Sequence, residues 1–272
     1  MPGKLYVVGT PIGNLGDISP RALQVLNAVD FIAAEDTRVT LKLLNHFEIK
    51  KQLVSYFEHN KYEKGAVIID RILSGETAAV VTDAGMPSIS DPGEELVRDA
   101  RNSGVEIESV PGPTAFATAL SISGMDSKKF CFEGFLPANP KERKAALLEV
   151  APFKRTLIFY EAPHKLKKTL IDMLNILGDR EIAICKELTK LHETVLRFTL
   201  SEAVEYFNQN EPKGEYVLIV SGGSREIIEY TLEDATALAK KYVDEGLSAS
   251  LAAKRAASET GIKKGEIYKL IV

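Results

Sequence analysis

The sequence predicts an α/β protein with two α/β domains and a small helical unit at its C-terminal end. Three observations lead to this prediction. In the first half of the chain, short β-rich runs alternate with helical segments, a pattern typical of a mainly parallel sheet covered by helices on both faces. A second alternating series starts after SISGMDS, and the residues from Thr231 onward contain three helical segments and no strand. We therefore expect domains at residues 1–123, 124–226 and 227–272.

The first predicted elements are a strand and a helix joined by a loop rich in glycine and proline. The strand is expected at Tyr6–Val8, and the loop GTPIGNLGDI follows it. Ser19 is the predicted N-cap of the helix and Pro20 its first residue, a strong start signal. Further strands of this domain are predicted at Phe31–Ala34, Ala78–Val81 and Val105–Val110.

The stretch VVTDAGMPSISDPGEELVRDA joins one of these strands to a helix. The pattern predicts Asp91 as the N-cap and Pro92 in the first turn. Glu94 and Glu95 follow, where the positive end of the helix dipole favours acidic side chains. Gly104 is predicted to end the helix.

The second domain repeats the alternation with longer runs. Its predicted strands are FCFEGFLP, TLIFYEAP, EIAICKEL and GEYVLIVSGG. Its predicted helices are KERKAALLEV and HKLKKTLIDMLNIL, the latter ending at Gly178.

The composition fits a globular chain and excludes several other classes. The 272 residues are 45% hydrophobic, and 34 Lys and Arg against 38 Asp and Glu give a net charge of −4, so the total charge does not indicate a nucleic-acid binder. No segment reaches the ~18 apolar residues of a membrane span, and MPGKLYVVG does not resemble a secretion signal. We therefore expect a cytoplasmic protein that does not associate with a membrane. Cys131 and Cys185 stand far apart and are interpreted as core residues, so no disulfide or metal site is predicted.

Three loops at the carboxyl ends of first-domain strands are candidates for binding a ligand. They read GTPIGNLGD, TDAGMPSISDPG and PGPTA, and ligands of open parallel sheets lie at this edge. None contains G-x-G-x-x-G or G-x-x-x-x-G-K-[ST], and the loops carry no Lys or Arg, the first one after GTPIGNLGD being Arg21. Such loops offer main-chain groups and close approach, which suits a nucleoside with little negative charge. The alternative is that they are only the tight turns that any α/β protein needs.

Seven motifs together resemble a known family. In chain order they are YVVGTPIGNLGDIS, AAEDTR, TDAGMPSISDPG, VPGPTA, FEGFLP, FYEAPHKL and KELTKLHE. They resemble the bacterial methyltransferases that modify the ribose 2′-hydroxyl of a decoding-centre cytidine in 16S ribosomal RNA, within the tetrapyrrole-methylase-like class (class III) of S-adenosylmethionine enzymes. The resemblance covers Lys4 to about Val220, and the tail resembles the family's small C-terminal helical domain.

The resemblance implies a fold, a cofactor and partners. The expected fold has two α/β domains with S-adenosylmethionine folded in the cleft between them. The expected partners are the small ribosomal subunit with its 16S ribosomal RNA and a second copy of the chain in a homodimer. The cofactor contacts implied by the motifs are Pro11, Asp83, Gly85, Met86, Thr114, Ala115, Glu161 and Ala162. More distant members have Gly-Asp-Pro where this chain reads Asp83-Ala84-Gly85, so these contacts are assigned by motif position.

Methyl transfer to a ribose hydroxyl requires that the donor and the hydroxyl be held in line. Because the hydroxyl is a poor nucleophile, a base or a polarising contact would help it, and no metal is needed. Candidates stand in AEDTR and KELTKLHE. Glu35, Asp36 and Arg38 follow a strand end, where acids beside an Arg suit a ribose or a phosphate; the alternative is an ion pair that braces the loop. Glu187 and His192 form a second candidate pair, and the alternative for His192 is an ordinary surface histidine.

Two basic stretches are candidates for RNA binding. Between residues 137 and 170, eight Lys and Arg against three Glu give a local balance of +5, and residues 250–272 give +3 from five against two. In the tail, Ala257, Gly261 and Ile267 have the spacing of a helix-turn-helix. The alternatives are solvated helix faces and a bundle that only packs on the body. The predicted RNA contacts are Lys141, Arg143, Lys144, Lys165, Lys167, Lys168, Lys254, Arg255, Lys263 and Lys264.

Two other functions stay open at this level. One is a methyltransferase of the same class that acts on a small tetrapyrrole-type molecule, although the basic stretches and the tail favour RNA. The other is a non-catalytic module that binds ribosomes and retains a cofactor fold.

Overall fold

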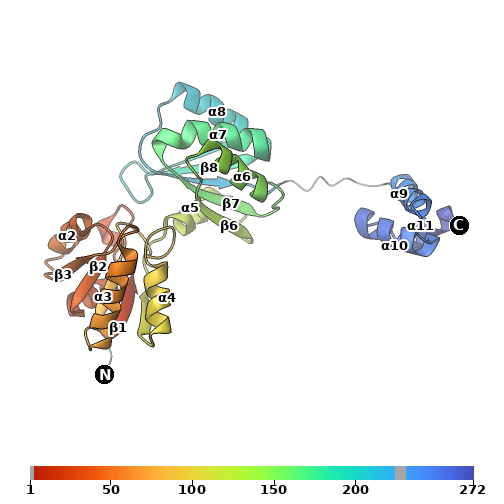
Figure 1. The fold of residues 1–272 in the computed structure, drawn as a ribbon. Coiled ribbons are helices and arrows are strands. Elements are labelled where there is room, and N and C mark those ends of the chain that lie inside the picture. The colour runs from red at the N-terminus through yellow and green to blue at the C-terminus, as the bar shows by residue number, and fades with distance from the viewer. Residues whose placement is uncertain (1–2, 224–230) are drawn as a thin grey trace. The chain divides into compact units, whose positions relative to one another are not determined.

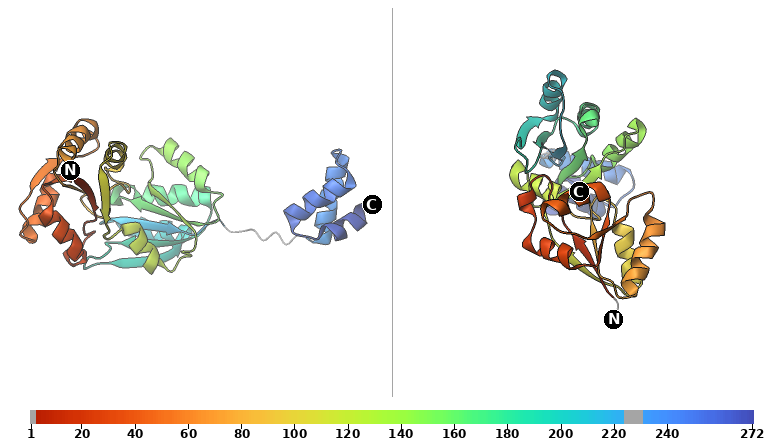
Figure 2. Two further views of the ribbon diagram at one scale, coloured as in Figure 1. Left: turned by 90° about the horizontal axis from the view of Figure 1, so that it is seen from below. Right: turned by 90° about the vertical axis from the view of Figure 1, so that its left-hand side faces the viewer.

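The computed structural model describes residues 3–223 and 231–272 of the chain. It divides into two compact units, residues 1–223 and 224–272. Figure 1 labels many of the elements of both units, and Figure 2 gives two further views. The predicted boundary near residue 124 stays a prediction, because both sheets of the protein belong to the first unit.

The first sheet of this unit is parallel throughout, as predicted. Its strands are β1 (Lys4–Val8), β2 (Phe31–Ala34), β3 (Gln52–Ser55), β4 (Ala78–Val81) and β5 (Glu106–Val110), in the order β3-β2-β4-β1-β5. The sequence analysis did not predict β3, whose four residues are all at least partly exposed and lack the apolar run of the other strands.

Side chains alternate between the two faces of this sheet, and helices cover both faces. Its helices are α1 (Pro20–Ala28), α2 (Thr37–His46), α3 (Lys61–Leu73) and α4 (Glu94–Asn102), with the short 3₁₀ turn η1 (Leu15–Asp17). On one face α3 and α4 pack against β1, β2 and β4, and on the other face α1 and α2 pack against them. Ser19 caps α1 as predicted, accepting a hydrogen bond from the Ala22 N–H at 3.0 Å.

The predicted start of α4 is wrong. The helix begins at Glu94, its N-cap is Gly93 with φ of 140°, and no side chain caps it. Ser88 and Ser90 also have positive φ, 69° and 66°, so the backbone turns irregularly before the helix. Asp91 is therefore a loop residue, and its carboxylate does not cap the helix.

The second sheet is mixed. Its strands are β6 (Phe130–Phe135), β7 (Thr156–Glu161), β8 (Glu181–Lys186), β9 (Thr194–Thr199) and β10 (Tyr216–Val220), in the order β6-β7-β10-β8-β9. Only β6 and β7 are parallel; β10 pairs antiparallel with β7 and β8, and β9 pairs antiparallel with β8. The sequence analysis did not predict β9 or the helix that follows it.

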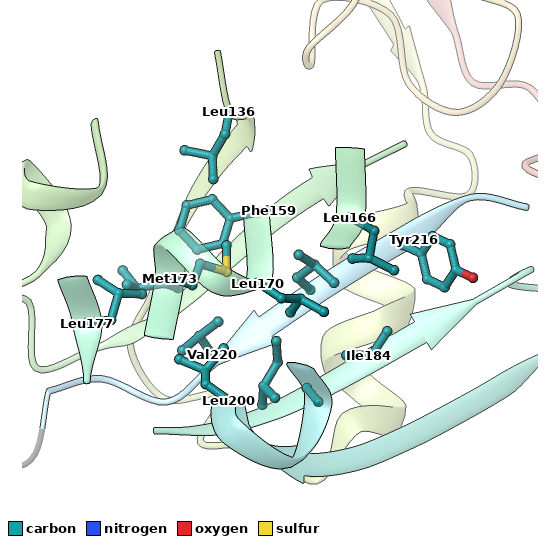
Figure 3. Close-up of a cluster of buried hydrophobic side chains, with 14 of the residues drawn as sticks. Leu136, Phe159, Leu166, Leu170, Met173, Leu177, Ile184, Leu200, Tyr216 and Val220 are labelled. Carbon is teal, nitrogen blue, oxygen red and sulfur yellow. The ribbon is translucent and has the colours of Figure 1, made fainter. Parts of the chain in front are cut away.

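Helices cover both faces of the second sheet. They are α5 (Ala115–Ser123), α6 (Pro140–Val150), α7 (Pro163–Leu177) and α8 (Leu200–Gln209). Figure 3 shows the core between α7 and the sheet, where Leu170 and Met173 face Phe159. Each of these three side chains is at most 1% exposed, and full burial of such a side chain stabilises by roughly 1.5–3 kcal/mol. On the opposite face, α5 packs against Ile158, Ala183 and Val217.

The described part of the second unit, residues 231–272, forms three helices, as predicted for the tail. They are α9 (Leu232–Asp244), α10 (Ala249–Thr260) and α11 (Lys264–Ile271). Four alanines surround Ile267 in their small core, and Gly261 ends α10 in the left-handed conformation with φ of 75°. No helix in the described part of the chain combines the length and the apolar character that crossing a bilayer requires.

Candidate functional site

A cavity of about 450 Å³ lies in the first unit where the strands of both sheets end. The loop after β4 forms one wall with residues 82–91. The start of α5 contributes Thr114 and Ala115, and the end of β7 contributes Tyr160 and Glu161. The two halves of the chain thus build one site, at the edge where the loops were predicted to bind a ligand.

The structure places seven of the eight predicted cofactor contacts in the wall of this cavity. They are Asp83, Gly85, Met86, Thr114, Ala115, Glu161 and Ala162. Pro11 is buried and does not line the cavity, although the next residue, Ile12, does.

The wall loop is held against the end of β1 through its main chain. Thr10 and Gly85 form an isolated antiparallel bridge, with N···O distances of 2.9 Å and 3.1 Å. The Thr10 hydroxyl donates to the carbonyl of Thr82 at 3.1 Å. Gly85 has φ of 93°, a conformation that only glycine adopts without strain. The loop therefore presents a main-chain surface to the cavity.

A second close approach joins the first and third loops. A Cβ on Gly9 would lie 2.7 Å from the Gly112 Cα, and one on Gly112 would lie 2.8 Å from the Gly9 Cα. Contacts this short exclude any side chain at either position. Gly9 and Gly112 are therefore required for the packing of the loops GTPIGNLGD and PGPTA, in agreement with the alternative interpretation of these loops. Both loops also lie beside the cavity.

Three carboxylates gather on one side of the cavity. The hydroxyl of Thr82 donates to Glu35 Oε2 at 2.5 Å, and the Asp83 N–H approaches the same oxygen at 3.3 Å. Asp83 in turn accepts from the Asp36 N–H at 3.1 Å. Burial raises the pKa of Asp83, and burial together with the negative charge of Glu35 raises the pKa of Asp91 to about 6.

No Lys or Arg stands among the described residues that line the cavity. Lys165, which does not line the cavity, lies 3.2 Å from Glu161 Oε1. Glu161 is 2% exposed and also accepts from the Ala162 N–H at 2.9 Å and the Thr169 hydroxyl at 2.5 Å. Glu161 thus fixes the turn after β7. The carboxylates of Glu35, Asp83 and Asp91 have no Lys or Arg beside them among the described residues of the cavity wall.

Tyr160 lies among aromatic side chains near the carboxyl end of β7, where it lines the cavity. Its hydroxyl accepts a hydrogen bond from the Phe116 N–H at 3.1 Å, and burial raises its pKa to about 12. Its ring packs edge-on against Phe132 and Phe135, with centroids 4.9 Å and 5.4 Å away. The sequence analysis did not select Tyr160 or Phe135, although both stand in quoted motifs, because aromatic residues at strand ends are usual in any core.

The catalytic candidates of AEDTR do not line the cavity, apart from Glu35. Asp36 caps α2 by accepting from the Arg38 N–H at 2.8 Å, and its carboxylate pairs with the Arg38 side chain at 2.6 Å. These hydrogen bonds lower the pKa of Asp36 to about 2. This geometry agrees with the alternative interpretation of AEDTR, in which an ion pair braces the loop.

Glu187 and His192 also lie outside the cavity wall. Glu187 Oε1 is 3.2 Å from Lys190 Nζ and accepts from the Glu215 N–H at 3.2 Å, which ties the loop after β8 to the start of β10. His192 is exposed on the same loop. The neighbours Leu188 and Glu215 line the cavity instead.

The structure divides the predicted RNA contacts into two groups. Arg143 is a correction: it is 5% exposed and pairs with the buried Asp172 at 2.7 Å, so its charge does not reach the surface. Lys165 pairs with Glu161, and Lys167 pairs with Glu211 at 2.6 Å. The remaining predicted contacts are exposed: Lys141, Lys144, Lys168, Lys254, Arg255, Lys263 and Lys264.

Comparison with known proteins gives consistent results. Residues 4–204 match the family described as Tetrapyrrole (Corrin/Porphyrin) Methylases. The chain is 48% identical over 272 residues to Ribosomal RNA small subunit methyltransferase I of Halalkalibacterium halodurans, covering 98% of this chain and 94% of that protein. It is 47% identical to the protein of that name from Vibrio cholerae, with coverages of 97% and 93%.

Solved structures share the fold at low sequence identity. A cobalt precorrin-4 methyltransferase of cobalamin biosynthesis has a TM-score of 0.59 and 21% identity, over 80% of this chain and 94% of that one. Uroporphyrin-III C-methyltransferase from Thermus thermophilus, solved with S-adenosylhomocysteine, has a TM-score of 0.58 and 19% identity, over 80% and 97%. These likenesses confirm the predicted fold class.

Proposed function

Because the chain belongs to the tetrapyrrole (corrin/porphyrin) methylase family, and within it to the methyltransferases named for small-subunit ribosomal RNA, we propose that it methylates 16S ribosomal RNA with S-adenosylmethionine. We propose the 2′-hydroxyl of a decoding-centre cytidine as the acceptor, as the seven motifs imply. The observation that carries the proposal is the cavity between the two sheets, which is walled by the motif residues, lined by carboxylates and free of described Lys and Arg.

The residues of the cavity fit the cofactor. A volume of about 450 Å³ lies within the range of roughly 300–1,000 Å³ that small ligands and cofactors occupy. S-adenosylmethionine supplies, when bound, a methyl group on a positively charged sulfonium. The carboxylates of Glu35, Asp83 and Asp91 favour a cationic ligand there, whereas a dinucleotide or triphosphate would meet only repulsion.

We assign the binding contacts as the motifs imply. The main chain around Gly85 and Met86 and the start of α5 at Thr114 and Ala115 form one side. The turn at Glu161 and Ala162 forms the other, with Asp83 between the sheets and Pro11 behind the wall. Because most of these groups are main chain, they are fixed before the ligand arrives, and little order is lost on binding.

We propose Asp91 as the group that accepts the proton of the ribose hydroxyl. It lines the cavity, and a pKa of about 6 leaves it mostly ionised at neutral pH yet more basic than an ordinary aspartate. Asp36 is a poor base in comparison, since its carboxylate is held by Arg38 and its pKa is about 2. The ribose oxygen would form a bond to the methyl carbon while the bond between that carbon and the sulfonium sulfur breaks, which would leave S-adenosylhomocysteine, and the hydroxyl proton would pass to an Asp91 carboxylate oxygen.

The partners complete the proposal. Lys141, Lys144 and Lys168 of the first unit, with the exposed cations of the second unit, are proposed to contact RNA. We propose a cytoplasmic homodimer, as the family resemblance implies, and sedimentation equilibrium of the full chain would measure its mass.

Methyl transfer from tritiated S-adenosylmethionine tests the proposed function. Small ribosomal subunits that lack the modification should accept label, and the labelled linkage should resist alkaline cleavage, because a 2′-O-methyl group blocks it. A tetrapyrrole acceptor in a parallel reaction should stay unlabelled. Label on the tetrapyrrole and none on the subunits, from a protein that binds the cofactor, would contradict the proposal.

A further inference from the structure

A second hollow lies at the opposite ends of two strands that reach the cavity. It is an open groove of about 920 Å³ between residues 126–130, which lead into β6, and residues 152–155, which lead into β7. We call it the basic groove, because four cations and one acid line it. The cations are Lys128, Lys129, Lys154 and Arg155.

The four cations of the basic groove differ from those of α6 and α7. Arg143, Lys165 and Lys167 each have a carboxylate partner within 3.2 Å. None of the four groove cations makes an ion pair with an acid in the described part of the chain, and all four are exposed. The one acid, Asp126, already accepts from the Lys128 N–H at 3.0 Å. The groove thus holds a concentration of positive charge that the protein itself does not neutralise.

The groove is built rigidly. Thr156, the first residue of β7, donates its N–H to the carbonyl of Lys129 at 3.1 Å and its hydroxyl to the carbonyl of Asp126 at 2.6 Å. On the other side, the Gly223 N–H donates to the carbonyl of Phe153 at 2.8 Å. A Cβ on Gly222 would lie 2.4 Å from the carbonyl oxygen of Lys154, so the two segments touch main chain to main chain. The cations therefore stand on a preformed scaffold.

Aromatic rings accompany these charges. Phe130 is 41% exposed, and the guanidinium of Arg155 lies 5.1 Å from the centroid of the Phe153 ring. Exposed aromatic rings and Arg planes beside cations are the surface on which unpaired bases stack while phosphates are neutralised. Isolated lysines would attract any polyanion, whereas this combination is typical of surfaces that bind single-stranded nucleic acid, and the proposed substrate makes that nucleic acid RNA.

The distance from the groove to the cavity suits one continuous strand of RNA. Both β6 and β7 have six residues, with their amino ends at the groove and their carboxyl ends, Phe135 and Glu161, in the cavity wall. Six residues of strand span about 17 Å. At about 3.4 Å per nucleotide along a helical strand, this corresponds to about five nucleotides.

We propose that the basic groove binds the RNA strand that flanks the acceptor nucleotide, about five nucleotides away, through phosphates and stacked bases. This proposal rests on the proposed function for the identity of the substrate. It adds to the RNA contacts proposed on α6 and α7 two segments that adjoin only because β6 and β7 are parallel neighbours.

Charge reversal in full-length protein tests the groove. The variant Lys128→Glu/Lys154→Glu should bind unmodified small subunits at least about tenfold more weakly, since each phosphate contact contributes to a salt-dependent affinity. The matched control is Lys42→Glu/Lys50→Glu, which makes the same charge change at exposed positions on α2 and in the loop between α2 and β3. Phe130→Ala should weaken binding about five- to a hundredfold, as loss of one stacked base does. Cofactor affinity, measured by calorimetry, should be unchanged in every variant.

The outcomes distinguish a failure of the groove proposal from a failure of the proposed function. If the groove variants bind subunits as tightly as the control, the groove proposal is wrong, even when labelling of ribosomal RNA succeeds. If wild-type protein neither binds the cofactor nor labels RNA, the proposed function fails, and the groove variants still report on RNA binding. Weakened binding of subunits with unchanged binding of a fluorescent oligouridylate would assign the groove to a ribosomal protein and would also overturn the RNA proposal.

Discussion

The two ends of β6 and β7 differ sharply in charge. At the carboxyl ends, the cavity has Glu35, Asp83 and Asp91 on its wall and no described Lys or Arg. At the amino ends, the basic groove has four cations and one acid. About 17 Å of strand therefore separates an acidic site from a basic one.

The difference shows how a chain with a net charge of −4 can serve two ligands of opposite charge. A cationic sulfonium is favoured by the acidic wall, and that wall repels RNA phosphates that are not held elsewhere. The basic groove holds those phosphates about two Debye lengths from the carboxylates, where salt screens most of the repulsion. Net charge alone conceals this arrangement, because the two sets of charges cancel in the total.

The largest expected effect comes from removing the base at the acidic end. Asp91→Asn should lower kcat about 100- to 1,000-fold, as expected for loss of general-base assistance, and should lower cofactor affinity by less, because Glu35 and Asp83 remain in the wall. Single-turnover methyl transfer measures the rate directly. Asp36→Asn is the control, because its carboxylate pairs with Arg38 outside the cavity. A larger loss in Asp36→Asn than in Asp91→Asn would reassign the base.

Next in size is a block of the main-chain wall. Gly85→Leu places a side chain at φ of 93° and toward Ile12, so cofactor affinity should fall at least about a hundredfold, while RNA affinity is kept. Gly104→Leu is the matched control: it has φ of 76° and open space around its Cβ, so it carries similar backbone strain away from the cavity. Equal cofactor affinity in the two variants, measured by calorimetry, would exclude the assigned wall.

The pH dependence of the rate is expected to be about tenfold. Asp91 must be ionised to accept a proton, and with a pKa of about 6 roughly nine-tenths is ionised at pH 7 and one-tenth at pH 5. The single-turnover rate should therefore fall about tenfold between these values, and the remaining rate of Asp91→Asn should lack this step. A profile that is flat down to pH 5 in the wild type would contradict the assignment.

The smallest effect concerns stability. The pKa of Asp91 is raised from 3.8 in the unfolded chain to about 6 in the fold, so the native state binds more protons between these values and loses stability as pH rises through them. At pH 7 the charged carboxylate is a cost, and Asp91→Asn should stabilise the fold by about 1–2 kcal/mol. Urea unfolding at pH 7 measures the difference, which should vanish near pH 4. Destabilisation at pH 7 would mean that the ionised carboxylate has partners that the fold requires.

Local sequence patterns predicted most of the helices and strands. The strands that these patterns missed are defined by their pairing with residues far away in the sequence. Ser19 and Pro20 mark the start of α1 because capping is local, and the apolar runs of β1, β2 and β4 mark buried strands. Strand β3 lacks such a run, since it lies at the sheet edge and stays partly exposed. It therefore carries no signal that distinguishes it from a loop.

The candidate site shows the same division. The cofactor loops could be predicted because their glycines and prolines are dictated by local backbone geometry, as at Gly85. Counting charges along the chain failed for Arg143, whose partner Asp172 is 29 residues away. It also missed the basic groove, since Lys129 and Lys154 are brought together only by the pairing of β6 with β7.

Salt dependence measured on one protein sample tests the central claim most directly. If the acidic cavity binds the cofactor and the basic groove binds RNA, the affinity for S-adenosylmethionine should change less than about twofold between 50 and 200 mM salt. The affinity for unmodified small subunits should fall at least about a hundredfold over the same range. A cofactor affinity that falls as steeply as the RNA affinity, or no heat with S-adenosylmethionine on folded protein, would contradict the account.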